Sequence, residues 1–215
     1  MTKRLVCFDM DGVIFRERNF WMELHKAYGT LEQGKLLTEK YLHSDYARLV
    51  EEVVVKLWRG MPEDKYLKLV ESYEYLQGVG DVFSFLKDKG CFTAIISASS
   101  IDVVRRVQRD FGIDFVFGNS LIFKNGKVSG EFDWPVGAGN DAKAKIVRDI
   151  SEKLNIGLKD IIYVGDSRND VDAFREVGTS IAFNCNFEPL KDLATYVVDS
   201  NNLSDVLPIL KKHLD

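Results

Sequence analysis

The stretch LVCFDMDG, residues 5–12, places two carboxylates directly after a short apolar segment. The run 5–8 is continuous, apolar and β-prone, as is typical of a strand buried in a parallel sheet. Asp9 and Asp11 then lie at its carboxyl end, where open α/β sheets bind ligands, and Gly12 lets the backbone turn. Crowded carboxylates attract a hard divalent cation such as Mg²⁺. Asp and Gly are also common turn residues, so a plain solvated turn is the alternative.

A second acidic cluster follows another short β-branched run. Residues 161–164 read IIYV, and GDSRND follows at 165–170. If the two runs are neighbours in one parallel sheet, Asp166 and Asp170 meet the first pair of acids at the same edge. Alone, the second cluster would also fit a helix N-terminus capped by Asp or Ser. Two clusters that both follow predicted strands favour a metal site built from oxygen ligands.

A third predicted strand, 92–96, is followed by SASS at 97–100 and then by a helical pattern. A hydroxyl and free backbone N–H groups converge at such a junction, which favours an anion. The alternative for Ser97 is an ordinary helix N-cap. The position of the segment at another strand end favours the anion site.

Two lysines lie in the first turn of a later predicted helix. Asn140 or Asp141 is expected to cap this helix, and Lys143 and Lys145 follow. A cation is unfavourable beside a helix N-terminus, so a lysine there suggests a nearby anion. The two side chains point to different faces of the helix, so only one of them can reach the site.

The long segment between the first and second predicted strands is helical in pattern. Apolar residues recur with helical spacing in 20–28, 49–58 and 66–73. An insertion of this length is too long for an ordinary crossover and predicts an all-helical cap domain over residues 16–75. Its aromatic residues are expected to form the core of the cap, because amphipathic aromatic side chains mostly pack.

The remaining chain alternates strands and helices, apart from a hairpin predicted at Asn125-Gly126. Such alternation predicts an α/β fold with a doubly wound, Rossmann-like parallel sheet. Residues 1–15 and 76–215 are therefore expected to form the core domain.

Composition limits the class of protein. The chain has 215 residues, a net charge of −4 and 46% hydrophobic residues, which is typical of a globular protein and argues against a nucleic-acid surface. No stretch approaches the roughly 20 apolar residues of a membrane span, and no secretory signal is recognised, so a cytoplasmic protein is expected. The three cysteines are expected to be buried, and His25, His43 and His213 to lie on helix surfaces.

The order of these features resembles the haloacid dehalogenase superfamily of phosphatases, and within it the phosphoserine phosphatase-like branch. The resemblance favours Lys143 over Lys145. It implies that Asp9 is the nucleophile that forms an aspartyl-phosphate, and that Asp11 protonates the leaving group and later activates water. It further implies a phosphate site and a Mg²⁺ site, built from Ser97, Ala98 and Lys143 and from Asp9, the Asp11 carbonyl, Asp166 and Asp170, with Asn169 and Gly12 in support.

The resemblance implies a small phosphorylated metabolite as substrate, with phosphoserine the leading candidate. Related phosphoserine phosphatases carry a Glu and an Arg that bind the amino acid, and Arg18 and Val54 stand at these positions here. Glu17 and Arg18 are therefore expected to affect specificity. A phosphotransferase or mutase would use the same motifs, and a receiver-like signalling protein is a further alternative. A monomer or homodimer is expected.

Overall fold

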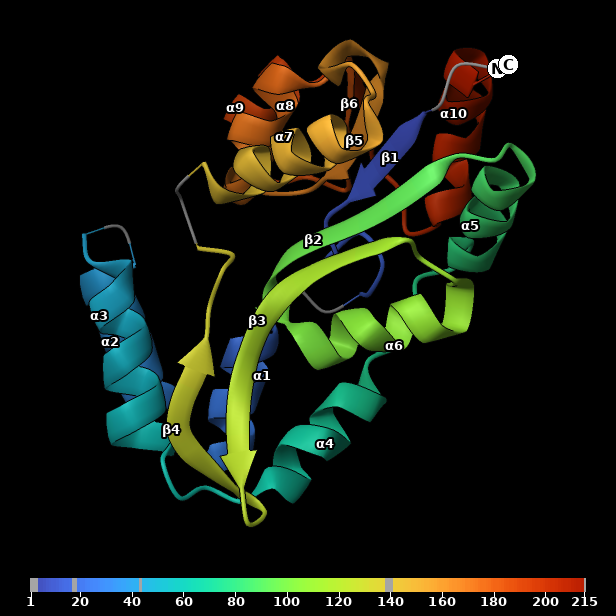
Figure 1. The fold of residues 1–215 in the computed structure, drawn as a ribbon. Helices are drawn as coiled ribbons and strands as arrows, with labels where there is room; N and C mark the ends of the chain where they lie inside the picture. Colours follow the sequence, from blue (N-terminus) through green and yellow to red (C-terminus); the bar gives the residue numbers. More distant parts are fainter. Residues whose placement is uncertain (1–3, 17–18, 43, 138–140, 215) are drawn as a thin grey trace.

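The computed structural model describes residues 4–16, 19–42, 44–137 and 141–214. A seven-stranded sheet with the order β4-β3-β2-β1-β5-β6-β7 forms the centre of this part of the chain (Figure 1). All neighbouring strands are parallel except the β3–β4 pair. The strands are β1 Leu5–Phe8, β2 Phe92–Ser100, β3 Phe115–Lys124, β4 Lys127–Asp133, β5 Ile161–Gly165, β6 Thr179–Phe183 and β7 Tyr196–Val198.

Helices cover both faces of the sheet, which confirms the doubly wound α/β fold. Val6 and Phe8 of β1 belong to one core cluster, and Leu5 and Cys7, which alternate with them, belong to the other. The first cluster includes α5 Val79–Asp88, α6 Ile101–Phe111, η4 Leu203–Val206 and α10 Leu207–Leu214. The second includes α7 Ala142–Leu154, α8 Val171–Glu176 and α9 Glu188–Leu193, and the short turns η2 Leu158–Asp160 and η3 Arg168–Asp170 flank β5.

A helical region follows β1 and lies beside the carboxyl ends of the central strands (Figure 1). It contains α1 Phe20–Tyr28, α2 Leu31–Tyr41, α3 Tyr46–Glu51, the π-helix η1 Glu52–Trp58 and α4 Glu63–Ser72. The predicted stripes correspond to α1, to α3 with η1, and to α4. Helix α2 lies in the predicted all-helical region, but its apolar pattern is weaker and no separate stripe was predicted for it. We call α1 to α4 with η1 the cap.

The central position of β1 brings the predicted motifs together. Phe8 is paired with Ile95 of β2 on one side and with Val164 of β5 on the other. The residues that follow these three positions therefore lie together at the carboxyl edge of the sheet. This register places the first acidic pair between the serine segment and the second acidic cluster.

The predicted hairpin is present and reaches the cap. Asn125 and Gly126 have φ values of 52° and 71°, as a tight two-residue β-turn requires. The Gly60 amide donates to the Val128 carbonyl at 2.8 Å, and the Val128 amide donates to the Met61 carbonyl at 2.9 Å. The hairpin thus connects the edge of the sheet to the cap, a contact that the sequence pattern did not reveal.

The structure corrects two predictions. Strand β2 runs to Ser100 instead of ending at residue 96, and Ser100 is the N-cap of α6, with its side chain accepting from the Asp102 amide at 3.2 Å. His25 is buried, not on a helix surface, because Trp58 and Thr30 enclose its ring. His213 is partly buried, and His43 lies outside the described residues. Cys7 and Cys185 are buried as expected, and Cys91 is partly buried.

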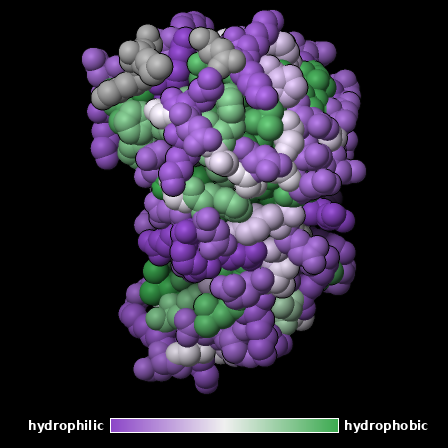
Figure 2. Space-filling model, turned by 90° about the vertical axis from the view of Figure 1, so that its right-hand side faces the viewer, coloured by the Kyte–Doolittle hydropathy of each residue, from purple (hydrophilic) through white to green (hydrophobic). Residues whose placement is uncertain are grey.

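The surface is largely polar on the face that carries α5 and α10. Apolar side chains gather there in separate groups between hydrophilic ones (Figure 2). Among the described residues, the helices are too short or too polar to cross a lipid bilayer. The cytoplasmic location and the oligomeric state stay predictions.

Candidate active site

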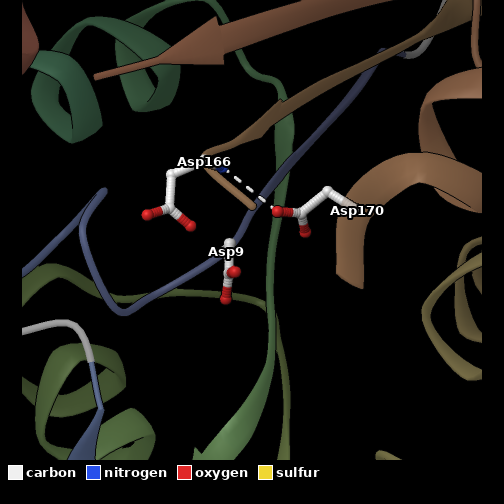
Figure 3. Close-up of side chains that lie close together, drawn as sticks. All are labelled: Asp9, Asp166 and Asp170. Carbon is white, nitrogen blue, oxygen red and sulfur yellow. Dashed lines mark hydrogen bonds between the residues drawn. The ribbon is translucent and has the colours of Figure 1, made fainter. Parts of the chain in front are cut away.

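Three buried carboxylates converge at the carboxyl edge of the sheet. Asp9 follows β1, Asp166 follows β5, and Asp170 ends the short turn η3 (Figure 3). One oxygen of each lies within 4.8 Å of one oxygen of the others. The two acidic clusters that the sequence places far apart therefore form one acidic triad.

Lys143 supplies a positive charge to the acidic triad. Its Nζ lies 2.7 Å from Asp9 Oδ2 and 2.7 Å from Asp170 Oδ1, and its side chain is 2% exposed. Burial alone would lower the pKa of Lys143, but the charges of Asp170 and Asp9 raise it above its ordinary value. Lys145 is exposed and pairs with Asp149 instead. Asp141, the N-cap residue of α7, makes no capping bond with its side chain, and Asn140 lies outside the described residues.

Asp170 is held in place from three directions. The Tyr163 hydroxyl donates to its Oδ1 at 3.1 Å, and the amides of Asp166 and Ser167 donate to its Oδ2 at 3.1 Å. A Cβ at Gly165 would lie 2.5 Å from the Asp170 Cγ, so the chain needs glycine at this position. The contact with Tyr163 was not predicted, because a tyrosine inside a buried apolar run reads as core.

Asp9 and Asp11 lie in a low-dielectric environment. The Met10 amide donates to Asp9 Oδ1 at 2.6 Å. Burial raises the pKa of Asp9 to about 6, and burial together with the charge of Asp9 raises the pKa of Asp11 to about 7. Asp11 Oδ1 is buried and has no hydrogen-bond partner among the residues that the structure describes. An unpaired buried carboxylate oxygen of this kind is uncommon outside functional sites.

The serine segment is fixed by two side chains that the sequence analysis did not select. Trp21 Nε1 donates to the Ala98 carbonyl at 2.8 Å, and Asn119 Nδ2 donates to the same oxygen at 2.9 Å. Asn119 is fully buried and also bonds both backbone groups of Val136 at 2.9 Å. Ser97 accepts from the Ser99 amide at 3.1 Å. Asn119 lies in the first half of β3, which was not predicted, so no sequence signal pointed to it.

A cavity of about 380 Å³ joins the acidic triad to the cap. Its lining at the triad end includes Asp9, Asp11, Ser97, Ala98, Ser99, Lys143, Asp166, Ser167 and Asn169. At the cap end it includes Asn19, Trp21, Met22, His25, Thr38, Leu42, Tyr46, Leu49, Val50, Val53, Val54, Trp58 and Trp134. Trp21 and Trp58 thus line the cavity as well as packing in the cap. Glu17 and Arg18 lie outside the described residues.

The charges of the site fit a divalent cation. Three carboxylates of the acidic triad face one buried lysine, which leaves two negative charges without a counter-charge when all are ionised. The donors are all oxygen atoms, as Mg²⁺ or a similar hard ion prefers. Asp11 does not contribute a side-chain oxygen to this group. The acidic triad therefore fits a hard divalent ion, and its geometry does not select one metal.

The comparisons with known proteins agree with the fold and the site. Residues 6–175 match the model of the haloacid dehalogenase-like hydrolases, and the chain belongs to this family. Its relatives and structural neighbours identify it as a member of the phosphoserine phosphatase branch.

Two archaeal relatives are named phosphoserine phosphatases. The protein from Archaeoglobus fulgidus is 30% identical over 211 residues, which cover 97% of this chain and 60% of that protein. The protein from Methanocaldococcus jannaschii is 28% identical over 97% of this chain and 98% of its own length. This chain therefore spans less than two thirds of the Archaeoglobus protein.

Two solved structures have the same architecture over nearly their whole length. A substrate-bound phosphoserine phosphatase complex superimposes with a TM-score of 0.85 at 26% identity, over 97% of this chain and 99% of that one. A phosphoserine phosphatase with a phospho-aspartyl intermediate analogue gives a TM-score of 0.84 at the same identity and coverage.

Proposed function

We propose that this protein is a Mg²⁺-dependent phosphomonoesterase that works through an aspartyl-phosphate on Asp9. The observation that carries the proposal is the buried acidic triad around Lys143 at the carboxyl edge of the sheet. Asp9 Oδ1 is held by the Met10 amide and Oδ2 by Lys143, so the carboxylate has a fixed orientation. In the first step an Asp9 oxygen bonds to phosphorus and the P–O bond to the alcohol breaks.

Asp11 is proposed as the acid and base. Its raised pKa favours a protonated carboxyl, which gives its proton to the departing alkoxide. In the second step Asp11 takes a proton from water, whose oxygen bonds to phosphorus while the P–O bond to Asp9 breaks. The products are the alcohol, inorganic phosphate and the restored carboxylates.

The phosphoryl oxygens are proposed to contact Ser97, the Ala98 segment and Lys143, all of which line the cavity. Asn119 and Trp21 both donate to the Ala98 carbonyl, which supports the orientation of the segment. Asp9 and Asp166 would hold the Mg²⁺ together with the Asp11 carbonyl, and Asp170 and Asn169 would support it. The ion supplies positive charge that stabilises the charge on the transferred group. Gly12, with φ of 79°, lets the chain turn directly after Asp11.

The cap is proposed as a domain over residues 16–75, with residues 1–15 and 76–215 as the catalytic core. The names of the relatives make phosphoserine the first substrate to test, with Glu17 and Arg18 as the proposed specificity residues. The partner would then be a small phosphorylated metabolite.

The test is phosphate release from a panel of phosphomonoesters with and without Mg²⁺. Asp9→Asn is expected to lower the rate by at least about 10³-fold, because the nucleophile is lost. Asp149→Asn is the matched control, since Asp149 is an exposed aspartate paired with Lys145. Addition of acceptor alcohols separates hydrolysis from transfer. Equal rates for the wild type and Asp9→Asn would reject the proposal.

A further inference from the structure

The two ends of the cavity differ in charge. Among the lining residues that the structure describes, the ionised side chains are those of the triad end, namely Asp9, Asp11, Lys143 and Asp166. The cap end is lined mainly by aliphatic and aromatic side chains from α1, α3, η1 and the segment after β4. A phosphate bound at the triad end therefore directs the rest of its ester into an apolar space.

The tryptophans of the cap end offer carbon surfaces, because their N–H groups already have partners. Trp21 Nε1 donates to the Ala98 carbonyl, and Trp134 Nε1 donates to the Tyr46 hydroxyl at 2.8 Å. Trp58 Nε1 lies 3.2 Å from His25 Nδ1. The centroids of Trp21 and Trp134 are 4.4 Å apart, and those of Trp21 and Trp58 are 5.9 Å apart. The indoles form one continuous aromatic cluster.

His25 does not supply a charge to this end. His25 Nδ1 is enclosed by the Trp58 indole, whose N–H can donate to it at 3.2 Å or to Thr30 Oγ1 at 3.3 Å. The Thr30 hydroxyl lies 2.7 Å from the same nitrogen. Burial lowers the pKa of His25 to about 4, in agreement with a neutral ring. A substrate carboxylate would find no cation in this ring.

We infer that the substrate is a phosphate monoester of an uncharged, apolar alcohol, preferably one with an aromatic ring, in preference to phosphoserine. The inference rests on the proposed phosphatase function and specifies the substrate class of that site. The body of phosphoserine carries an ammonium and a carboxylate, for which the described side chains of the cap end offer no ion-pair partner. Burying an ion without a partner is costly. An apolar body gains free energy from the same desolvation, and an aromatic ring also packs well against indoles.

The first test compares three esters of primary alcohols, which makes their leaving groups chemically similar. Propyl phosphate has the three-carbon chain of phosphoserine without its charges, and 2-phenylethyl phosphate adds a ring. We expect kcat/KM to be at least about tenfold higher for 2-phenylethyl phosphate than for propyl phosphate, and higher for propyl phosphate than for phosphoserine. A preference for phosphoserine over both would overturn the inference and leave the phosphatase function intact.

The matched variants are two leucines in the same region. Leu49 lines the cavity, whereas Leu36 on α2 is 68% exposed. Leu49→Ala should lower kcat/KM for 2-phenylethyl phosphate about tenfold, mainly through KM, and should affect propyl phosphate less. Leu36→Ala should behave as the wild type. Equal effects of Leu49→Ala on both esters would contradict the assignment of this end to the body of the substrate.

A binding test does not require turnover. The sequence contains three tryptophans, and all three line the cavity, so intrinsic fluorescence reports on it directly. 3-Phenylpropylphosphonate should bind at least about tenfold more tightly than 2-amino-4-phosphonobutyrate, the phosphonate counterpart of phosphoserine. Tighter binding of the amino acid analogue would overturn the inference. If the phenyl compound binds selectively but no ester is hydrolysed, the phosphatase function is rejected and the apolar binding site is retained.

Discussion

Lys143 shows how a single residue determines the charge balance of the site. It is the first-turn lysine that enters the core, and it contacts the acids of two different strand ends. The sequence restricted the choice to Lys143 or Lys145, because the two point to different faces of one helix. In the structure Lys143 is buried beside Asp9 and Asp170, whereas Lys145 is exposed, so Lys143 is the lysine at the site.

Replacing the two lysines by methionine separates a buried charge from an exposed one. At pH 8 without metal, Lys143→Met should lower the free energy of unfolding by about 3–5 kcal/mol, because buried carboxylates lose their counter-charge. Lys145→Met removes an exposed pair with Asp149 and should cost at most about 0.5 kcal/mol. Urea unfolding followed by circular dichroism measures both. A loss below 1 kcal/mol for Lys143→Met would contradict the buried ion-pair network.

Other residues of the site follow from tertiary contacts that sequence patterns do not encode. Asp9, Asp11, Asp166 and Asp170 could be selected because acids followed predicted strands. Asn119 and Tyr163 could not be selected in this way. One is a single polar residue in the unrecognised first half of β3, and the other is a tyrosine in an apolar run, and both have ordinary structural explanations. Their roles appear only when Ala98 and Asp170 are seen beside them.

At the scale of elements, α2 and η1 illustrate the limits of pattern reading. Helix α2 has few buried residues and contains Gly34, so no apolar stripe marked it within the predicted all-helical region. The second apolar stripe predicted one helix, but the chain forms α3 and then a π-helix from Glu52 to Trp58. The strands that carry the site were clearer, because buried parallel strands are short apolar runs.

Gly34 is required by the packing between α1 and α2. A Cβ there would lie 2.6 Å from three atoms of the His25 ring. Gly34→Ala should therefore destabilise the protein by about 1–3 kcal/mol, although alanine is the better helix former. Gly80 in α5 is the control, because a Cβ there meets only Phe111 Cε1 at 3.6 Å. Gly80→Ala should be neutral or stabilising by up to about 1 kcal/mol.

Thermal unfolding of the two variants measures this difference. A stabilising effect of Gly34→Ala would show that the His25 ring moves away at little cost, and would contradict the tight packing of α1 on α2.

For the whole molecule, proton binding and metal binding are linked through the acidic site. Asp9 and Asp11 have folded-state pKa values of about 6 and about 7, above the usual 3.8. Without metal, their contribution to stability is present at low pH and is lost as the pH rises through 6 to 7. A divalent cation binds the ionised Asp9 carboxylate, so it should restore the part of this contribution that comes from Asp9 at high pH.

The increase in melting temperature on adding Mg²⁺ should therefore be larger at pH 8 than at pH 5. At an ion concentration of 100 times the dissociation constant, binding contributes ~2.7 kcal/mol, or about 5–10 °C for a chain of this size. NaCl at the same ionic strength is the control. Equal increases at both pH values would show that the ion does not bind to the ionised acidic triad.

The contacts between the hairpin and the cap make the sheet and the cap mechanically coupled. The amides of Gly60, Val128 and Glu63 cross between two segments, so the tip of an edge strand pair belongs to the wall of the cap. If the cap rotates and these hydrogen bonds are kept, the tip of the hairpin must move with the cap. The backbone then has to bend within β3 and in the chain after Asp133.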